Sequence, residues 1–150
     1  MSVLTYNPKE NIILVVEAAN RVHFNNPVLA DLTVCQAILE SNLLHTPSVL
    51  AMEYNNLFGI KGTGTDGAVL LPTHEYYNGE MKIVRDYFAK NKTLDDSIEQ
   101  HRLLLEKERY KPVREAKTFE EAAVQIKRCG YATDNQYPEK LIKIFNNFVR

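Results

Sequence analysis

Residues 68–87 read AVLLPTHEYYNGEMKIVRDY and predict the only β-structure of the chain. Two β-rich segments, 68–77 and 81–87, flank the dipeptide Asn78-Gly79. Asn-Gly between two such segments is the strongest short signal for a two-residue hairpin, because both turn residues must adopt positive φ. We therefore expect one antiparallel β-hairpin.

Helix signals lie on both sides of this hairpin. Asn-Pro pairs at 7–8 and 26–27 begin amphipathic segments that extend to about Val22 and Leu44, since proline suits the first turn of a helix. Further capping signals, including Ser/Thr residues followed by acidic residues, predict helices over about 48–54, 94–107, 119–129 and 139–148. The pattern predicts an α+β fold: a mostly helical domain with a small β-hairpin lobe.

Length and composition describe an ordinary globular chain. With 150 residues, 45% hydrophobic and 25% charged, residues 1–150 are predicted to form a single domain. The net charge of −1 excludes a dedicated nucleic-acid binder, so no nucleic-acid partner is expected. The first 75 residues carry net −4 and the last 75 net +3, which indicates either a solvated surface or an acidic centre facing an anionic polymer.

The hydrophobic segments, the first residues and the cysteines indicate where the chain is made. The longest aliphatic segment, Ile12–Val16, is far shorter than the roughly 20 residues that span a bilayer. The first ten residues, MSVLTYNPKE, lack the features of a secretory signal. Cys35 and Cys129 lack C-x-x-C spacing and are predicted to be small buried hydrophobes. We expect synthesis in the cytoplasm without a signal peptide, and no membrane span.

Two short motifs resemble a dinucleotide-binding site and a zinc site, but their context does not fit either ligand. The segment 62–67 matches G-x-G-x-x-G, but a strand follows it where a dinucleotide site needs a helix, so it is predicted to be a turn. The segment 74–78 begins like H-E-x-x-H but has Asn78 in place of the second histidine. We expect no metal site and no cofactor.

Two glutamates are the candidates for chemistry. Glu40 lies in the second predicted helix beside Leu39 and one turn from Gln36, so partial desolvation would raise its pKa toward that of a general acid. Taken alone, such a glutamate is also typical of a helix edge. Glu75 lies on the hairpin and by itself is an exposed strand residue. Together the two could flank a glycosidic bond.

Tyrosines are the candidates for sugar contacts. The chain has eight tyrosines and no tryptophan, so stacking on a sugar must come from Tyr or Phe. Tyr131 and Tyr137 bracket a polar loop, and Tyr76 follows Glu75. The alternative for each is core packing with the hydroxyl hydrogen-bonded inside the protein.

An ordered set of short segments resembles glycoside hydrolase family 73, the bacterial and phage β-N-acetylglucosaminidases that cut peptidoglycan. The resemblance covers roughly residues 10–150. Its segments are QAILES at 36–41, SVLA at 48–51, NNLFGIK at 55–61, THE at 73–75, RY at 109–110 and GYATD at 130–134, followed by Tyr137.

The resemblance implies a lysozyme-like fold and hydrolysis of the β-1,4 bond between N-acetylglucosamine and N-acetylmuramic acid. Glu40 would be the general acid and Glu75 the second carboxylate. Tyr131 would line the cleft beside the acid and help to orient the N-acetyl group.

The substrate contacts implied by the resemblance come mostly from a loop. Asn56, Phe58 and Gly59 would form the turn and wall under the substrate, and Tyr76 and Tyr137 complete the predicted contacts. Family members commonly continue Glu-Ser with Gly-Trp-Gly, whereas residues 42–45 read NLLH.

Three alternatives stay open at the level of sequence. They are a lytic transglycosylase, a muramidase on the same polymer, and a non-catalytic wall-binding or structural virion module. The partner is expected to be bacterial peptidoglycan and the protein a monomer. The short chain without an export signal favours a phage endolysin or tail-associated hydrolase, or an effector delivered to the cell wall.

Overall fold

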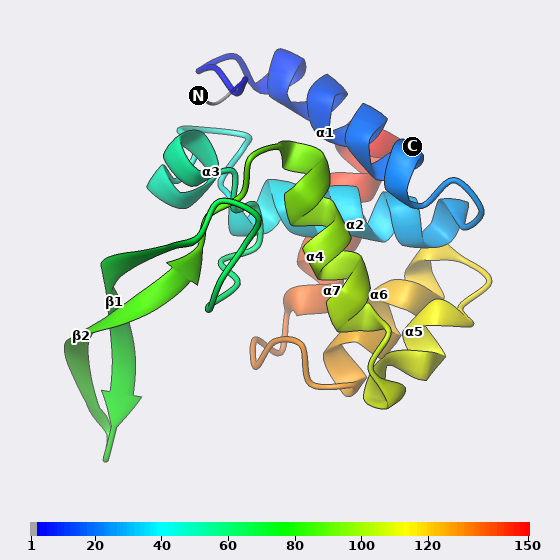
Figure 1. Ribbon diagram of the computed structural model, residues 1–150. Coiled ribbons are helices and arrows are strands. Elements are labelled where there is room, and N and C mark those ends of the chain that lie inside the picture. The colour runs from blue at the N-terminus through cyan, green and yellow to red at the C-terminus, as the bar shows by residue number, and fades with distance from the viewer. Residues whose placement is uncertain (1–2) are drawn as a thin grey trace.

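A computed structural model describes residues 3–150 of the protein. Residues 1–2, the start of the segment predicted to lack a signal sequence, lie outside the described residues. Figure 1 shows a body of packed helices from which one hairpin projects. The helices are α1 (Pro8–Val22), α2 (Pro27–Glu40), α3 (Val49–Tyr54), α4 (Leu94–Leu105), α5 (Lys111–Arg114), α6 (Phe119–Arg128) and α7 (Tyr137–Ile144). The predicted α+β class is confirmed.

The predicted helix starts are confirmed by side-chain caps. Asn7 accepts hydrogen bonds from two backbone N–H groups of α1, and Asn26 accepts one from Leu29. Thr93 and Thr118 do the same for α4 and α6. Each cap satisfies an N–H group that has no partner within the helix.

The end of α2 differs from the prediction. The helix ends at Glu40 and not near Leu44, because Asn42 adopts a left-handed conformation with φ of 55°. The N–H of Leu43 then donates to the carbonyl of Ile38 at 3.0 Å, which is the Schellman arrangement. Leu43 is fully buried beyond the cap, so its apolar side chain extended the helical pattern past the true end.

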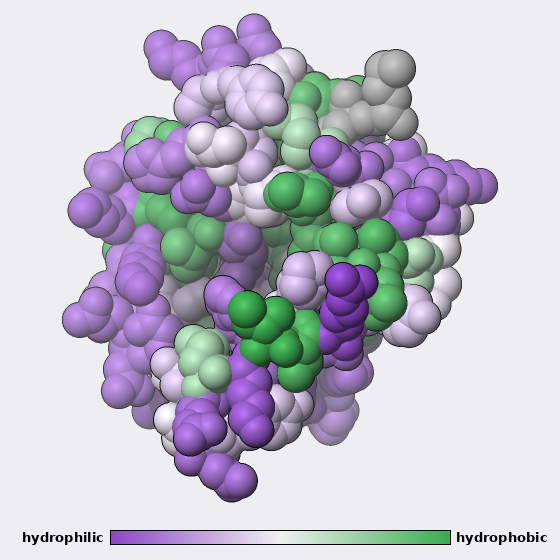
Figure 2. Space-filling view, turned by 90° about the vertical axis from the view of Figure 1, so that its left-hand side faces the viewer, coloured by the Kyte–Doolittle hydropathy of each residue, from purple (hydrophilic) through white to green (hydrophobic). Residues whose placement is uncertain are grey.

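The hairpin consists of β1 (Ala68–Tyr77) and β2 (Glu80–Ala89), paired antiparallel with Ala68 opposite Ala89. Asn78 and Gly79 have φ of 51° and 81°, as the predicted turn requires. The segment 62–67 is a turn that leads into the first strand, as expected. Figure 2 looks onto the hairpin side and shows hydrophobic residues gathered over the middle of this face.

The core surrounds α2, which packs against α1, α6 and α7. Leu32 and Ile38 are fully buried there, and Cys35 is buried as predicted. Cys129 is only half-buried because it caps the carboxyl end of α6. Both cysteines are free. None of the helices in the described part of the chain is long and apolar enough to cross a membrane.

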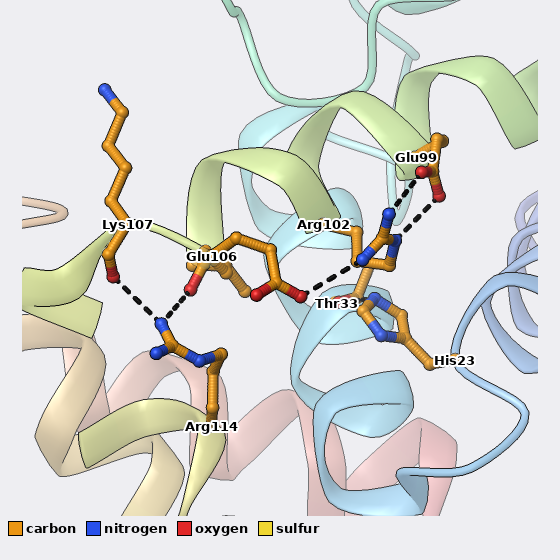
Figure 3. Close-up of polar contacts among 8 residues, drawn as sticks. His23, Thr33, Glu99, Arg102, Glu106, Lys107 and Arg114 are labelled. Atoms are coloured by element: carbon orange, nitrogen blue, oxygen red, sulfur yellow. Dashed lines mark hydrogen bonds and ion pairs between the residues drawn. The ribbon is translucent and has the colours of Figure 1, made fainter. Parts of the chain in front are cut away.

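A connection that the sequence did not predict fixes the end of α4. The 3-10 turn Glu108–Tyr110 and the short helix α5 follow it, and Arg114 of α5 donates to the carbonyls of Leu105 and Lys107 at 2.7 and 2.9 Å (Figure 3). Arg102 pairs with Glu99 earlier in α4 at 2.6 Å. Elements as short as α5 carry too few residues to show helical periodicity.

Candidate active site

The carboxyl end of α2 is anchored on both sides of Glu40. The next residue, Ser41, is buried and donates its hydroxyl proton to the carbonyl of Leu57. The N–H of Leu57 donates to Ser97 Oγ on α4 at 3.0 Å. These bonds join α2, the loop before the hairpin and α4, so the position of Glu40 is set by three parts of the chain.

Glu40 lies in a cleft of about 730 Å³. The first half of the chain supplies the acidic Glu40, and the second half supplies the basic Arg109 and Lys140. The second half also supplies the acidic Asp134, so the charges of the cleft are not divided between the two halves as their net charges are. The lining residues are Leu39, Glu40, Phe58, Ile60, Leu104, Arg109, Tyr110, Gly130, Tyr131, Ala132, Thr133, Asp134, Tyr137 and Lys140.

Glu40 combines solvent access with crowding. Its side chain is exposed in the open cleft, yet the walls surround it closely enough that desolvation raises the pKa of its carboxyl group. Tyr137 Oη donates to Glu40 Oε1 at 3.0 Å, which lowers the pKa by a smaller amount. The net shift is upward, which is the requirement for a general acid that must hold its proton.

Two tyrosines lie beside Glu40, and their hydroxyl groups differ in hydrogen bonding. Tyr131 and Tyr137 stack with ring centroids 6.1 Å apart. Within the described residues, no group hydrogen-bonds the Tyr131 hydroxyl, so it is free to meet a ligand in the cleft. Tyr137 is 3% exposed and its hydroxyl is bonded to Glu40 and Gln36. The hydroxyl of Tyr137 is therefore engaged by the acid, and contact of the Tyr137 ring with substrate stays a prediction.

The cleft also contains charged residues that were not among the predicted site residues. Asp134 is paired with Lys140 at 2.6 Å and accepts from the N–H of Gln136, and Lys140 lowers the pKa of its carboxyl group. Arg109 lies over the ring of Tyr110, 4.7 Å from its centroid. Asp134 and Arg109 belong to the quoted family-like segments, whereas Lys140 carries no signal in the sequence.

The structure does not bring Glu75 into this cleft. Glu75 lies on β1, where it accepts hydrogen bonds from Lys61 Nζ at 2.7 Å and Tyr77 Oη at 3.0 Å. Lys61 also pairs with Asp86 at 2.9 Å. Tyr76 points from the other face of the strand and is 71% exposed. The predicted carboxyl pair is therefore not assembled around one cavity here.

In the loop before the hairpin, some residues line the cleft and others support the residues that line it. Phe58 lines the cleft as predicted. Asn56 is 1% exposed, and its amide bonds the backbone of Phe58, Ile60 and Ala89. Gly59 has φ of 67°, a conformation that favours glycine. Asn56 and Gly59 therefore shape the wall from behind, and the predicted direct contact of Asn56 with substrate is corrected to support.

Metal ligands do not gather in the described part of the chain, where no three His, Cys, Asp or Glu side chains are placed to hold an ion. The cleft is open, is lined by tyrosines and cations, and contains a carboxyl group whose pKa is raised by desolvation. A helical body, a hairpin lobe and such a glutamate define a lysozyme-like glycoside hydrolase.

Comparison with known proteins identifies the family. The glucosaminidase family, described as mannosyl-glycoprotein endo-beta-N-acetylglucosaminidase, matches residues 16–149, and the chain belongs to it. The predicted family of glycoside hydrolases is thereby confirmed, and the match supports an enzyme.

Relatives in sequence and structure agree with this assignment. Exo-glucosaminidase LytG of Bacillus subtilis is 39% identical over 127 residues, which are 81% of this chain and 44% of that protein. The catalytic domain of the Listeria monocytogenes autolysin Auto superposes with a TM-score of 0.81 at 27% identity, covering 96% of this chain and 86% of that one. A C-terminally truncated glycoside hydrolase domain of Salmonella typhimurium FlgJ gives a TM-score of 0.70 at 28% identity, covering 93% of this chain and 96% of that one. The chain spans less than half the length of these curated relatives.

Proposed function

We propose that this chain hydrolyses the glycan strands of peptidoglycan at the β-1,4 bond that follows N-acetylglucosamine. The observation that carries the proposal is Glu40, a carboxyl group with a raised pKa at the open side of a tyrosine-lined cleft. Family membership supports a glycosidase, and relatives named as peptidoglycan hydrolases support the polymer.

In the proposed reaction, Glu40 donates its proton to the leaving glycosidic oxygen. The C–O bond breaks through an oxocarbenium-like state. The water that adds to the sugar carbon gives up one proton to a carboxylate, either Glu75 or the now deprotonated Glu40. Tyr131, whose hydroxyl is free in the cleft, would hydrogen-bond the N-acetyl group. Arg109 and Lys140 would meet the carboxylates of the polymer.

Glu75 is proposed as the second carboxylate, which requires the hairpin to bend toward the cleft when a glycan strand binds. The hairpin is joined to the body at its base, where Ala89 N–H donates to Ile60 O and Asn56 Nδ2 to Ala89 O. Beyond this base the two strands project away from the helices (Figure 1), and an isolated two-stranded hairpin is only marginally stable. The alternative is that the N-acetyl group of the substrate assists in place of Glu75.

Digestion of purified peptidoglycan tests the proposal. Wild type, Glu40→Gln and the control Glu139→Gln, an exposed residue of α7, are incubated with the polymer, and the products are reduced with borohydride and identified by mass spectrometry. Reduced N-acetylglucosamine ends from wild type and the control, but not from Glu40→Gln, are expected. Reduced muramic acid ends or anhydro ends would replace the proposal by a muramidase or a transglycosylase. Binding without new ends would make the chain a wall-binding module.

The setting is proposed from the sequence. A monomeric state and delivery by a phage, a virion or an effector system stay predictions. Lysis of cells that express the chain with a membrane-permeabilising partner is the outcome expected for an endolysin.

A further inference from the structure

Two polar side chains are fully buried next to the site, and the proposed reaction gives them no role. Gln36 on α2 and His101 on α4 are each 0% exposed. Buried polar groups cost stability unless they are hydrogen-bonded, so their partners indicate what they do. Gln36 precedes Glu40 by four residues, which places both side chains on the same face of α2.

These side chains form one continuous series of hydrogen bonds that ends at Glu40. His101 Nε2 lies 2.9 Å from Gln36 Oε1. Gln36 Nε2 donates to Tyr137 Oη at 3.0 Å, and Tyr137 Oη donates to Glu40 Oε1 at 3.0 Å. The series joins α4, α2 and α7 and leads from the core to the cleft.

The direction of the series is fixed by which groups can donate. The carbonyl oxygen of Gln36 only accepts, so His101 must carry its proton on Nε2. The amide nitrogen of Gln36 only donates, so Tyr137 accepts there and has its single proton left for Glu40. If the Gln36 amide were rotated by half a turn, Tyr137 would donate to Gln36 and Glu40 would lose this bond.

The surroundings of His101 select the first direction. Phe58 stacks on the imidazole with ring centroids 4.1 Å apart, and Tyr131 meets its edge at 5.8 Å. Burial, with a smaller effect from His23, lowers the pKa of His101 to about 3, so the ring is neutral and has one proton. Within the described residues His101 Nδ1 is buried without a partner. An unpaired ring nitrogen that only accepts costs less than a buried N–H without an acceptor, which places the proton on Nε2.

This direction decides which oxygen of Glu40 carries the acid proton. The Tyr137 proton points at Oε1, so a second proton on Oε1 would face it directly. Within the described residues no group hydrogen-bonds Oε2. We propose that Gln36 and His101 are positioning residues that orient the Tyr137 hydroxyl and thereby place the acid proton of Glu40 on Oε2, free for the leaving oxygen. This inference rests on the proposed role of Glu40 as the general acid.

The test compares substitutions along the series on soluble peptidoglycan fragments. The variants are His101→Leu, Tyr137→Phe and their double mutant, with kcat and KM measured as a function of pH. Tyr137→Phe removes a hydrogen bond to a charged group, so kcat should fall about tenfold and the alkaline limb should move up by about one pH unit. His101→Leu lets the Gln36 amide rotate. It should therefore also lower kcat and move the alkaline limb up, with KM little changed.

The double mutant shows whether His101 acts through the Tyr137 hydroxyl or only stabilises the fold. Because both changes remove the same bond to Glu40, the double mutant should be no worse than Tyr137→Phe alone. The conservative variant His101→Gln, whose amide can still donate to Gln36, should recover part of kcat. Thr33→Val is the matched control, since Thr33 is a buried polar residue of α2 that contacts His23 and not this series. It should leave the alkaline limb unchanged.

The pH profile must be assigned among the groups that line the cleft. The titratable and charged side chains around Glu40 are Arg109, Tyr110, Tyr131, Asp134, Tyr137 and Lys140. Lys140 lowers the pKa of Asp134, whereas burial raises the pKa of Tyr110, Tyr131 and Tyr137 above the ordinary tyrosine value. A limb that moves in Tyr137→Phe and His101→Leu is therefore assigned to Glu40, the carboxyl group that Tyr137 hydrogen-bonds.

A wild-type measurement keeps the proposal falsifiable when a variant does not fold. Long-range 1H–15N NMR of the intact chain reads the histidine tautomer, and His101 should be a neutral Nε2–H imidazole at every pH where the protein is folded. An Nδ1–H tautomer, an unmoved alkaline limb in His101→Leu, or multiplying losses in the double mutant would overturn the inference. An active Glu40→Gln variant would instead overturn the proposed function and leave the tautomer result standing.

Discussion

Glu40 and Glu75 are the same residue type in opposite surroundings. Glu40 ends a buried helix, has one tyrosine as its partner, and is crowded enough for desolvation to raise its pKa. Glu75 lies on a projecting hairpin and is paired with the cation of Lys61 and the hydroxyl of Tyr77. The helical body thus raises the pKa of its carboxyl group by desolvation, whereas the hairpin pairs its carboxyl group with a cation.

Turnover should separate the two glutamates most strongly. Glu40→Gln removes the acid and should lower kcat about 10³-fold, whereas Glu75→Gln should lower it about 10²-fold, within the range of acid–base contributions. Release of reducing ends from peptidoglycan measures both. Equal turnover of Glu75→Gln and wild type would remove Glu75 from the mechanism and favour assistance by the substrate.

The junction between body and hairpin depends on Asn56. Asn56→Ala leaves four backbone groups, the carbonyls of Ile60 and Ala89 and the N–H groups of Phe58 and Ile60, without their side-chain partner. It should lower the free energy of unfolding by about 2–3 kcal/mol. For a chain of this size that is a fall in Tm of roughly 5–10 °C. Thermal unfolding of Asn56→Ala beside the exposed control Asn20→Ala checks this. Loss of hydrogen-exchange protection confined to the hairpin base would locate the effect.

The raised pKa of Glu40 predicts a trade between activity and stability. The folded state holds this proton more tightly than the unfolded chain, so its stabilising effect is complete below the ordinary value of about 4.5 and is lost as pH rises through the raised pKa. Glu40→Gln should therefore be more stable than wild type at pH 7, by roughly 1–2 °C in Tm because the side chain is exposed. The two should unfold alike below pH 4. A stability gain that grows toward acid pH would contradict this.

The smallest effect is expected at Lys61. Lys61→Gln leaves Glu75 and Asp86 without their shared cation and should lower kcat/KM about two- to threefold at low salt. High salt should reduce the difference, because screening weakens exposed pairs. Lys82→Gln is the control, since it also removes one positive charge, from strand β2, and Lys82 has no ion pair among the described residues. Equal losses in both variants would assign the effect to net charge.

Much of the fold could be predicted from the sequence because its signals are local. Asn7, Asn26, Thr93 and Thr118 cap helices with their own side chains, and Asn78-Gly79 forms the turn that its φ values require. The end of α2 was missed because Leu43 packs into the core after the helix has stopped. A hydrophobic period cannot distinguish a buried residue within a helix from one just beyond its cap.

Local signals in the sequence were enough to predict the helices and the hairpin, because caps and turns act within a few residues, and the family resemblance singled out Glu40 as the candidate acid. Only the tertiary structure decided which side chains meet Glu40. It placed Asp134 and Lys140 in the cleft, left Glu75 outside it, and joined His101 to Glu40 across 61 positions of sequence through Gln36 and Tyr137. Desolvation and hydrogen bonding depend on contacts between distant segments, and no local pattern records those contacts.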